Sequence, residues 1–241
     1  MYIVEGNMGV GKSTFVKILQ KKLPDVSVHL EPREYWMNNS GEQSLLGSFF
    51  RDPHRWEYTL ETFVMMCRAK EYLRIRASKK HNIIMERSIY SGHFCYAQNS
   101  FANGYFTPLE WKLYNEWVDF LIRKNCHPPL GFIYLRSQPE KCFARVKKRN
   151  WKSEKHAPFS FIENLHKFHE KFLINKIGIF QELKNVPVLV LDGNANFVTD
   201  NEIQSGYVKK VEIFMQDASH QDAPHPNTSH KKALINCFLN T

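Results

Sequence analysis

A phosphate-binding pattern near the start of the chain, G-x-x-x-x-G-K-S, constrains the fold more than any other feature. It consists of Gly6, Asn7, Met8, Gly9, Val10, Gly11, Lys12, Ser13 and Thr14. An apolar run precedes the pattern and apolar residues at helical spacing follow it, which is the order of strand, loop and helix that the pattern requires. Glycines let the backbone fold closely around an oxyanion, and the helix N-terminus adds exposed N–H groups. We expect Lys12 to reach the outer phosphates of a nucleotide and Ser13 to hold Mg²⁺.

Strand and helix patterns alternate along the rest of the chain. After the first strand, strands are predicted at residues 26–30, 82–85, 131–135 and 186–191, and helices at 53–78, 90–102, 107–124 and 159–183, with a basic helix opening at Pro139. This order predicts an α/β fold, a parallel sheet of about five strands with helices on both faces. Residues 1–214 are expected to form one domain. From about Gln216 the composition turns polar, so residues 215–241 are expected to form a flexible tail.

Charge and hydropathy exclude some classes of protein. No apolar run is long enough to cross a bilayer, and the N-terminus lacks the regions of a signal peptide, so we expect a cytoplasmic protein without a membrane partner. The five cysteines lack metal-ligand spacing and are expected to be reduced thiols. The net charge of +9 has two interpretations: a phosphate or nucleic-acid partner, or solvated lysine-rich helix faces. Solvated faces are the default.

Charged residues follow two of the predicted strands directly. Glu31 precedes Pro32 at the end of the strand at 26–30, and Glu86-Arg87 follows the strand at 82–85. Strand ends form the rim where α/β proteins bind ligands, so Glu31 is a candidate acceptor for the proton of a hydroxyl nucleophile. Glu86 and Arg87 suggest a Mg²⁺-linked acid and a phosphate clamp. The alternatives are a surface glutamate and an exposed salt bridge.

Two helices carry further candidates. Glu61, Val64 and Arg68 lie at intervals of three and four on the helix at 53–78 and therefore share a face. Glu61 and Arg68 either pair with each other or bind a polar ligand. The helix from Pro139 carries Arg145 and Arg149 and leads into a polar stretch, which is what a lid over a triphosphate needs, although a solvated basic helix explains the same pattern.

Together these segments resemble the deoxyribonucleoside kinases of the deoxycytidine and deoxyguanosine kinase type. The matching segments are Gly6–Thr14, Glu31-Pro32 with Trp36, Pro53–Arg68, Glu86-Arg87-Ser88, Arg145–Glu154 and residues 186–197. The resemblance covers nearly everything up to about residue 200, and several spaced motifs agree in order. It implies a P-loop kinase fold with an arginine-bearing lid, a homodimer built through helices, and ATP-dependent phosphorylation of the 5′-hydroxyl of a deoxyribonucleoside with Mg²⁺.

The resemblance also implies roles for particular residues. Glu31 matches the carboxylate on the sugar 5′-hydroxyl, and either Glu31 or Glu86 is the general base. Arg87 matches the arginine that holds the 5′ oxygen and the phosphate. The substrate-binding positions are Glu31, Trp36, Phe50, Glu61, Val64, Arg68, Arg87, Tyr96 and Glu154. The ATP-binding positions are the P-loop residues with Arg145, Arg149, Asn196 and Phe197, and the metal positions are Ser13 and Glu86.

Four departures from the family pattern bear on the substrate. Glu61 stands where the family has a base-reading glutamine. An ionised carboxylate only accepts hydrogen bonds, so it suits a guanine edge, whose ring N–H and amino group both donate. The aspartate partner of Arg68 falls at Gly92, so Arg68 is expected to pair with Glu61. Phe50 replaces a tyrosine on the sugar 3′-hydroxyl, and Trp151 replaces a third lid arginine. We therefore expect a preference for deoxyguanosine or purines generally.

Two other functions fit parts of the sequence. A nucleoside monophosphate kinase of thymidylate type would share the P-loop but act on monophosphates. A P-loop nucleic-acid-binding protein without kinase activity would use the positive charge. Carboxylates at Glu31 and Glu86 beside the phosphate loop argue against a nucleic-acid partner because they would repel a polyanion.

Overall fold

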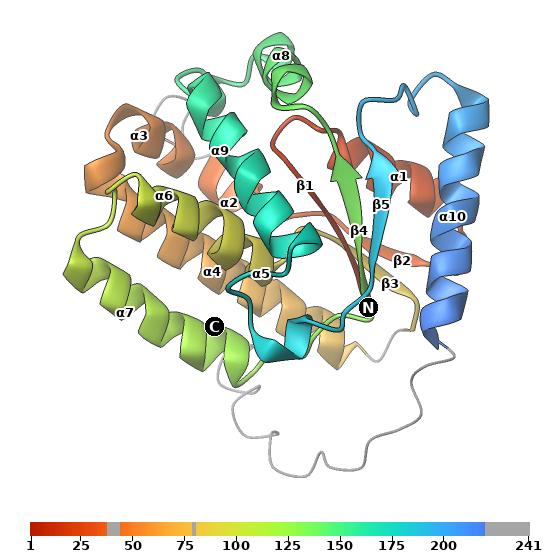
Figure 1. Ribbon diagram of the computed structural model, residues 1–241, viewed down its shortest axis with the longest axis horizontal. Helices are drawn as coiled ribbons and strands as arrows, with labels where there is room; N and C mark the ends of the chain where they lie inside the picture. Colours follow the sequence, from red (N-terminus) through yellow and green to blue (C-terminus); the bar gives the residue numbers. More distant parts are fainter. Residues whose placement is uncertain (38–43, 79–80, 220–241) are drawn as a thin grey trace.

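The computed structural model describes residues 1–37, 44–78 and 81–219, and a five-stranded parallel sheet lies at its centre (Figure 1). The strands are β1 (Tyr2–Gly6), β2 (Ser27–His29), β3 (Ile83–Glu86), β4 (Gly131–Arg136) and β5 (Val188–Asp192). Their order across the sheet is β2-β3-β1-β4-β5. All four pairings are parallel. The predicted α/β architecture is confirmed, and the ends of β1, β2 and β3 lie at one edge of the sheet.

Helices cover both faces of the sheet. Alternate residues of β4 serve the two faces: Phe132 and Tyr134 belong to one buried cluster, and Ile133 and Leu135 to the other. The first cluster packs beneath α4 (Pro53–Ala77), η2 (Gly92–Ala97), α7 (Pro108–Val118) and η3 (Asp119–Arg123). The second packs beneath α1 (Lys12–Lys22) and α10 (Asn201–Ser219). In Figure 1, α8 (Pro139–Arg149) lies beyond the carboxyl end of β4, and α9 (Phe159–His169) runs from there back across the sheet beside α6. The short helix η4 (Lys152–Glu154) lies between α8 and α9 in the chain.

Helix starts follow the capping residues in the sequence. Asp52 caps α4 by accepting a hydrogen bond from the Arg55 amide at 3.3 Å, and Pro53 occupies the first turn, where a missing N–H does no harm. Thr107 and Glu110 form a reciprocal capping box at α7, as their spacing predicts. Both helices therefore begin where the sequence analysis expects.

Several helix predictions need correction. The helix expected at 159–183 ends early: α9 continues only through η5 (Glu170–Ile174), and Lys176 and Gly178, both with positive φ, turn the chain before η6 (Gln181–Leu183). The helix expected at 90–102 is divided into α5 (Ile89–Ser91), η2 and α6 (Gln98–Ala102). The short helices α2 (Glu34–Met37), which carries Trp36, and α3 (Leu45–Arg51) were not predicted.

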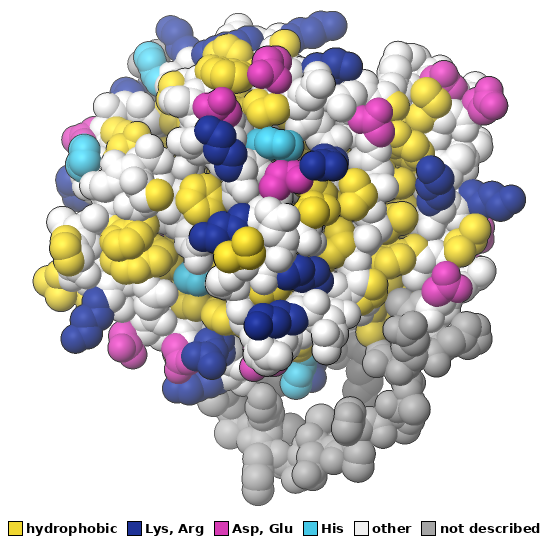
Figure 2. All heavy atoms as spheres, viewed as in Figure 1, with side chains coloured by type: hydrophobic (Ala, Val, Ile, Leu, Met, Phe, Trp, Pro, Cys, Tyr) yellow, Lys and Arg dark blue, Asp and Glu magenta, His cyan; other side chains and the backbone are white. Residues whose placement is uncertain are grey.

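The helix α10 crosses the expected domain boundary at residue 214 and extends to Ser219. The rest of the predicted tail, residues 220–241, lies outside the described residues. Within the described ranges, none of the helices combines the length and the hydropathy needed to cross a bilayer. On the face seen in Figure 2, Lys and Arg side chains are scattered and alternate with Asp and Glu, which is typical of solvated helix faces.

Candidate active site

The P-loop, residues Gly6–Thr14, turns so tightly after β1 that a residue with a Cβ would not fit at Gly6 or Gly9. Gly9 has φ +81°, and a Cβ there would lie 2.4 Å from the Cys142 carbonyl oxygen of α8. A Cβ at Gly6 would lie 2.7 Å from the Leu135 carbonyl oxygen of β4. Both positions need glycine because a side chain would collide with backbone. This tight turn places the N-terminus of α1, where an anion can bind to backbone N–H groups, directly after β1.

Lys12 is buried in this loop, and it forms no ion pair within the part of the chain that the structure describes. Its Nζ donates to the carbonyl oxygens of Gly6 at 3.0 Å and Asn7 at 2.8 Å. Burial, with the nearby Arg87 guanidinium, lowers the pKa of Lys12 to about 7. Bound phosphates would restore its full positive charge, so this site is electrostatically prepared for an anion.

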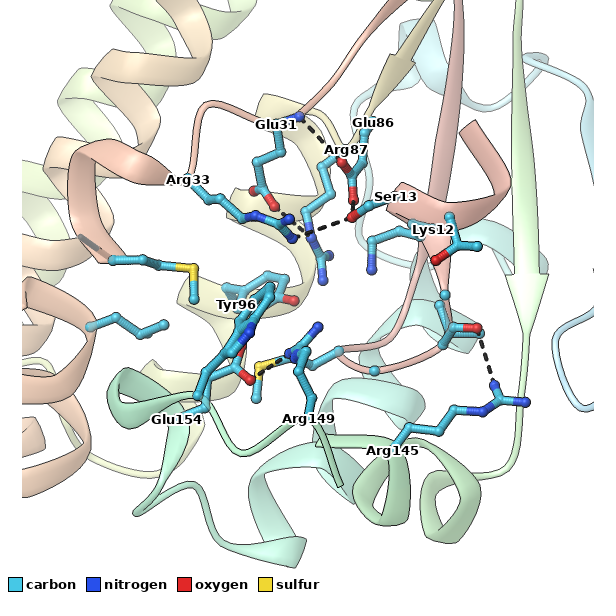
Figure 3. A pocket seen from close by; sticks show the side chains of 18 of the residues that line it. Lys12, Ser13, Glu31, Arg33, Glu86, Arg87, Tyr96, Arg145, Arg149 and Glu154 are labelled. Atoms are coloured by element: carbon cyan, nitrogen blue, oxygen red, sulfur yellow. Dashed lines mark hydrogen bonds and ion pairs between the residues drawn. The ribbon is translucent and has the colours of Figure 1, made fainter. Parts of the chain in front are cut away.

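Ser13, in the first turn of α1, and Glu86, at the end of β3, bring a hydroxyl oxygen and a carboxylate together (Figure 3). The Ser13 hydroxyl donates to Glu86 Oε1 at 2.5 Å, and the Glu31 amide donates to Glu86 Oε2 at 3.3 Å. Arg33 donates from Nη1 to the Ser13 hydroxyl at 3.3 Å. A hydroxyl and a carboxylate next to a phosphate site are the oxygen donors that Mg²⁺ prefers.

Glu31 is held by two guanidinium groups. Arg68 donates to its Oε1 through Nε at 3.2 Å and through Nη2, and Arg87 Nε lies 3.3 Å from its Oε2. Burial alone would raise the pKa of Glu31, but Arg68 and Arg87 together outweigh burial and lower it. Glu31 is therefore an ionised, oriented acceptor at neutral pH. The expected pair between Arg68 and Glu61 is wrong, because Arg68 turns to Glu31 instead.

Arg87 occupies an unusual backbone conformation at the end of β3. Its φ is +62°, a region that non-glycine residues rarely adopt. The guanidinium lies 4.9 Å from the centre of the Tyr96 ring, and a tyrosine face attracts such a cation. Strained backbone of this kind concentrates at functional sites, where the surrounding structure holds a side chain in one direction.

The predicted lid, the segment Arg145–Glu154, is held together by contacts between its own residues. Arg149 forms an ion pair with Glu154, and its guanidinium lies 3.7 Å from the centre of the Trp151 ring. Arg33 approaches the same ring at 4.6 Å. The Trp151 ring therefore contacts the guanidinium groups of both Arg149 and Arg33. Arg145 instead donates to the carbonyl oxygens of Val10 at 3.1 Å and Gly193 at 2.9 Å and ties the lid helix to the P-loop.

One cavity of about 700 Å³ connects these groups. Apart from Gly6 and Asn7, every predicted site residue lines it, including Trp36, Phe50, Val64, Tyr96, Glu154 and Asn196. Asn7 is buried and anchors the loop to α9 by donating to the Ile162 carbonyl oxygen at 2.8 Å. Phe197 both lines the cavity and packs on Phe15, with ring centres 5.5 Å apart.

Two functional candidates were missed by sequence reasoning. Arg33 follows Glu31 by two residues, and its position just after a strand end was the available signal. Glu57 lies one helical turn before Glu61, so the period of the helix places both on one face. Because a buried carboxylate is uncommon, an acid at this position looks like a solvent-exposed residue in the sequence.

Comparisons with known proteins agree with the geometry. A deoxynucleoside kinase family model matches residues 2–216. A mitochondrial deoxyguanosine kinase of Xenopus laevis is 33% identical over 233 residues, which cover 88% of each chain. A deoxycytidine kinase 2 of Gallus gallus is 33% identical, covering 88% of this chain and 89% of its own. A probable deoxycytidine kinase of Fowlpox virus is 32% identical, covering 89% of this chain and 87% of its own. This chain belongs to the deoxynucleoside kinase family.

Proposed function

We propose that this protein transfers the terminal phosphoryl group of ATP to the 5′-hydroxyl of a deoxyribonucleoside, a step of nucleotide salvage. The strongest support is that a single cavity contains both the P-loop and the Glu31 carboxylate held by Arg68 and Arg87. Phosphoryl transfer depends on positioning and charge neutralisation more than on covalent chemistry by the protein. A hydroxyl that donates to Glu31 would face the phosphates bound in the loop.

Each charged residue has a distinct task in this reaction. The loop amides and Lys12 bind the phosphates of ATP, and Arg149 and Arg33 neutralise charge from the lid side. Arg87 holds the 5′ oxygen and the phosphoryl group that it receives. Glu31 accepts the hydrogen bond of the 5′-hydroxyl, fixes the direction of attack and takes the proton as the bond to phosphorus forms. Glu86 is the other candidate for the base.

Mg²⁺ fits the site through Ser13 and Glu86. Their oxygens lie 2.5 Å apart, beside the loop that binds the phosphates. Within the described residues no cluster of three or more His, Cys, Asp or Glu side chains is suited to a metal. Mg²⁺ usually binds one or two protein oxygens and completes its coordination shell with phosphates and water, so Ser13 and Glu86 would be sufficient protein ligands. When bound, Mg²⁺ would be held by Ser13 and Glu86 and would neutralise charge on the phosphates.

We further propose that deoxyguanosine is the preferred substrate. Glu61 lines the cavity on the same face of α4 as Val64 and Arg68. An ionised carboxylate offers two acceptors, and the guanine edge offers two donors, the ring N–H and the amino group. Trp36, Phe50 and Tyr96 provide the aromatic surface that a purine ring needs.

A substrate panel tests this function. The purified chain is incubated with ATP and Mg²⁺ and with each of the four natural deoxynucleosides and the four corresponding monophosphates. Phosphorylation of nucleosides, with deoxyguanosine giving the highest kcat/KM, is the expected result, and Lys12→Ala is the inactive control. Activity on monophosphates alone would instead identify a thymidylate-type kinase. ATP binding without any phosphorylation, together with a salt-dependent shift of DNA, would identify a nucleic-acid-binding protein.

We propose a homodimer that forms through α7 and its neighbours. Leu109, Leu113 and Trp117 lie at intervals of four on α7 and are exposed, and Phe101 of α6 is exposed beside them. Hydrophobic side chains gather over α6 and α7 at the left of Figure 2. A patch of this kind on a helix pair typically marks an interface. Analytical ultracentrifugation should give a dimer for the natural chain and a monomer for Leu113→Glu.

The cytoplasm is the compartment that we propose, because the four cysteines of the described residues are free thiols, as is usual in a reducing compartment. A relative in Xenopus laevis is mitochondrial by name, so a mitochondrial location is the alternative to test. A fluorescent fusion at the C-terminus of the full chain, compared with a mitochondrial dye, distinguishes the two. Overlap with the dye would overturn the proposal.

A further inference from the structure

Two buried glutamates lie one turn apart on α4, the helix that also carries Arg68. Glu57 is 1% exposed and Glu61 is 6% exposed, and the two share a helix face because they are four residues apart. Glu61 lines the cavity, whereas Glu57 lies behind the cavity wall. Buried carboxylates are uncommon unless a cation or hydrogen-bond donors surround them.

Among the described residues, Glu57 has no cation beside it, and the Ser100 hydroxyl only partly opposes the effect of burial on its pKa. Neither of its carboxylate oxygens has a hydrogen-bond partner in the part of the chain that the structure describes. Its polar neighbours are the Ser100 hydroxyl and Tyr114, and the charge that acts on it most is that of Glu61. A lone charged carboxylate is expensive in such a place, so Glu57 keeps its proton.

Glu61 is surrounded by charges of both signs. The ionisable groups that act on it come from four elements of the structure: Glu31 after β2, Arg68 of α4, Arg87 after β3 and Tyr114 of α7. Burial dominates and raises the pKa of Glu61 to about 7, while Arg68 opposes the rise. Arg68 is already bound to Glu31, and Glu61 has no ion pair with it. Glu61 therefore changes charge close to neutral pH.

Protonation would change the hydrogen bonds that Glu61 offers to a base. An ionised carboxylate presents two acceptors, and a protonated carboxyl presents one donor and one acceptor. The guanine edge has two adjacent donors. The adenine edge has a donor and an acceptor. Ionised Glu61 is therefore complementary to guanine, and protonated Glu61 is complementary to adenine.

We propose that Glu57 and Glu61 form an acid pair that carries at most one negative charge, and that this charge selects the purine: the ionised pair accepts deoxyguanosine and the fully protonated pair accepts deoxyadenosine. This inference rests on the proposed function. Glu57 acts as a positioning residue, because its uncharged carboxyl lets the pair's single charge reside on Glu61 at the cavity wall. Two interacting acids of this kind release their protons in separate steps.

The test is the ratio of kcat/KM for deoxyguanosine to that for deoxyadenosine, measured between about pH 5.5 and about pH 8.5. The ratio cancels the titration of Lys12, Glu31 and ATP, which both substrates share. We expect it to rise with pH, approaching about tenfold per pH unit around the midpoint. Glu61→Gln, with a fixed donor and acceptor, should give a flat ratio shifted toward deoxyadenosine, and Glu57→Gln should keep the rise.

A ratio that stays flat in the natural chain would overturn the acid pair while leaving the kinase function intact. A ratio that still rises in Glu61→Gln would overturn it as well. If neither nucleoside is phosphorylated at any pH by a chain that binds ATP, the proposed function itself fails.

A second measurement needs no variant. Calorimetric binding of each nucleoside near pH 7, repeated in buffers of different ionisation enthalpy, counts the protons exchanged. Deoxyguanosine should release protons because it favours ionised Glu61, and deoxyadenosine should take them up. Deoxyguanosine binding without proton release would contradict the proposal.

Discussion

The buried acid that follows β2 and the two buried acids of α4 differ in charge behaviour. Glu31, Glu57 and Glu61 are all buried, and burial by itself raises the pKa of each. Glu31 contacts Arg68 and Arg87 and its pKa falls below the usual value. Glu57 and Glu61 form no ion pair, and their pKa values rise. Contacts with cations, rather than burial, therefore decide which of these acids is charged. Glu31 is suited to proton transfer, and Glu61 is suited to a proton-dependent choice of base.

Arg68 lies close to both Glu31 and Glu61. It lies on the same face of α4 as Glu61 but binds Glu31, 37 residues away in the chain. Gly92 makes room for its guanidinium, since a Cβ at that position would lie 2.8 Å from Arg68 Nη1. The difference in charge between Glu31 and Glu61 therefore depends on which of the two acids binds Arg68.

The largest expected effect comes from removing the charged acid. Glu31→Gln should lower kcat by about a hundredfold or more, because the amide cannot take the proton of the 5′-hydroxyl. ATP affinity, measured by calorimetry, should be unchanged, since the P-loop is intact. Glu34→Gln, an exposed glutamate of α2, is the matched control. Unchanged turnover would mean that another group, with Glu86 the first candidate, takes the proton.

A smaller effect should follow from removing the shared cation. Arg68→Met deletes a positive charge that favours ionised Glu31, so the pKa of Glu31 should rise. Activity would then be lost at a higher pH as the solution is acidified, which a profile of kcat/KM against pH measures. Lys70→Met on the exposed side of α4 is the control. An acid limb that does not move would show that Arg87 alone sets the charge of Glu31.

The smallest expected effect concerns stability without substrate. The pKa of Glu61 is raised from 4.5 to about 7 in the folded protein, so the folded state holds a proton that the unfolded state has lost. Stability from this group is therefore complete at low pH and is lost as the pH rises through about 7. Between about pH 6 and about pH 8 the free energy of unfolding should fall by about 1 kcal/mol more in the natural chain than in Glu61→Gln.

Chemical denaturation at several pH values checks this difference, because the common titration of all other groups cancels between the two proteins. Glu212→Gln on the exposed surface of α10 should behave like the natural chain. An equal pH dependence in Glu61→Gln would show that Glu61 is ionised throughout, and the contrast with Glu31 would disappear.

Local patterns in the sequence were sufficient for the scaffold of the site. The glycines at Gly6 and Gly9, the capping residues Asp52 and Thr107, and the alternation of strands and helices all act over a few residues, so their structural consequences could be read directly. The helix predicted to reach Leu183 failed because the residues beyond Ile174 turn the chain, and helical spacing of apolar residues does not reveal such a turn.

The sequence by itself determined which groups meet at the strand ends: a phosphate loop, Glu31, Glu86 and Arg87, each placed by its own strand. The tertiary structure alone decided what those groups are bound to. The choice of Glu31 over Glu61 by Arg68, and the burial of Glu57 without a partner, depend on the packing of segments distant in the chain. Charge state follows from such contacts because the energy of an ionised group depends on every neighbour in space, and spacing along the sequence specifies few of them.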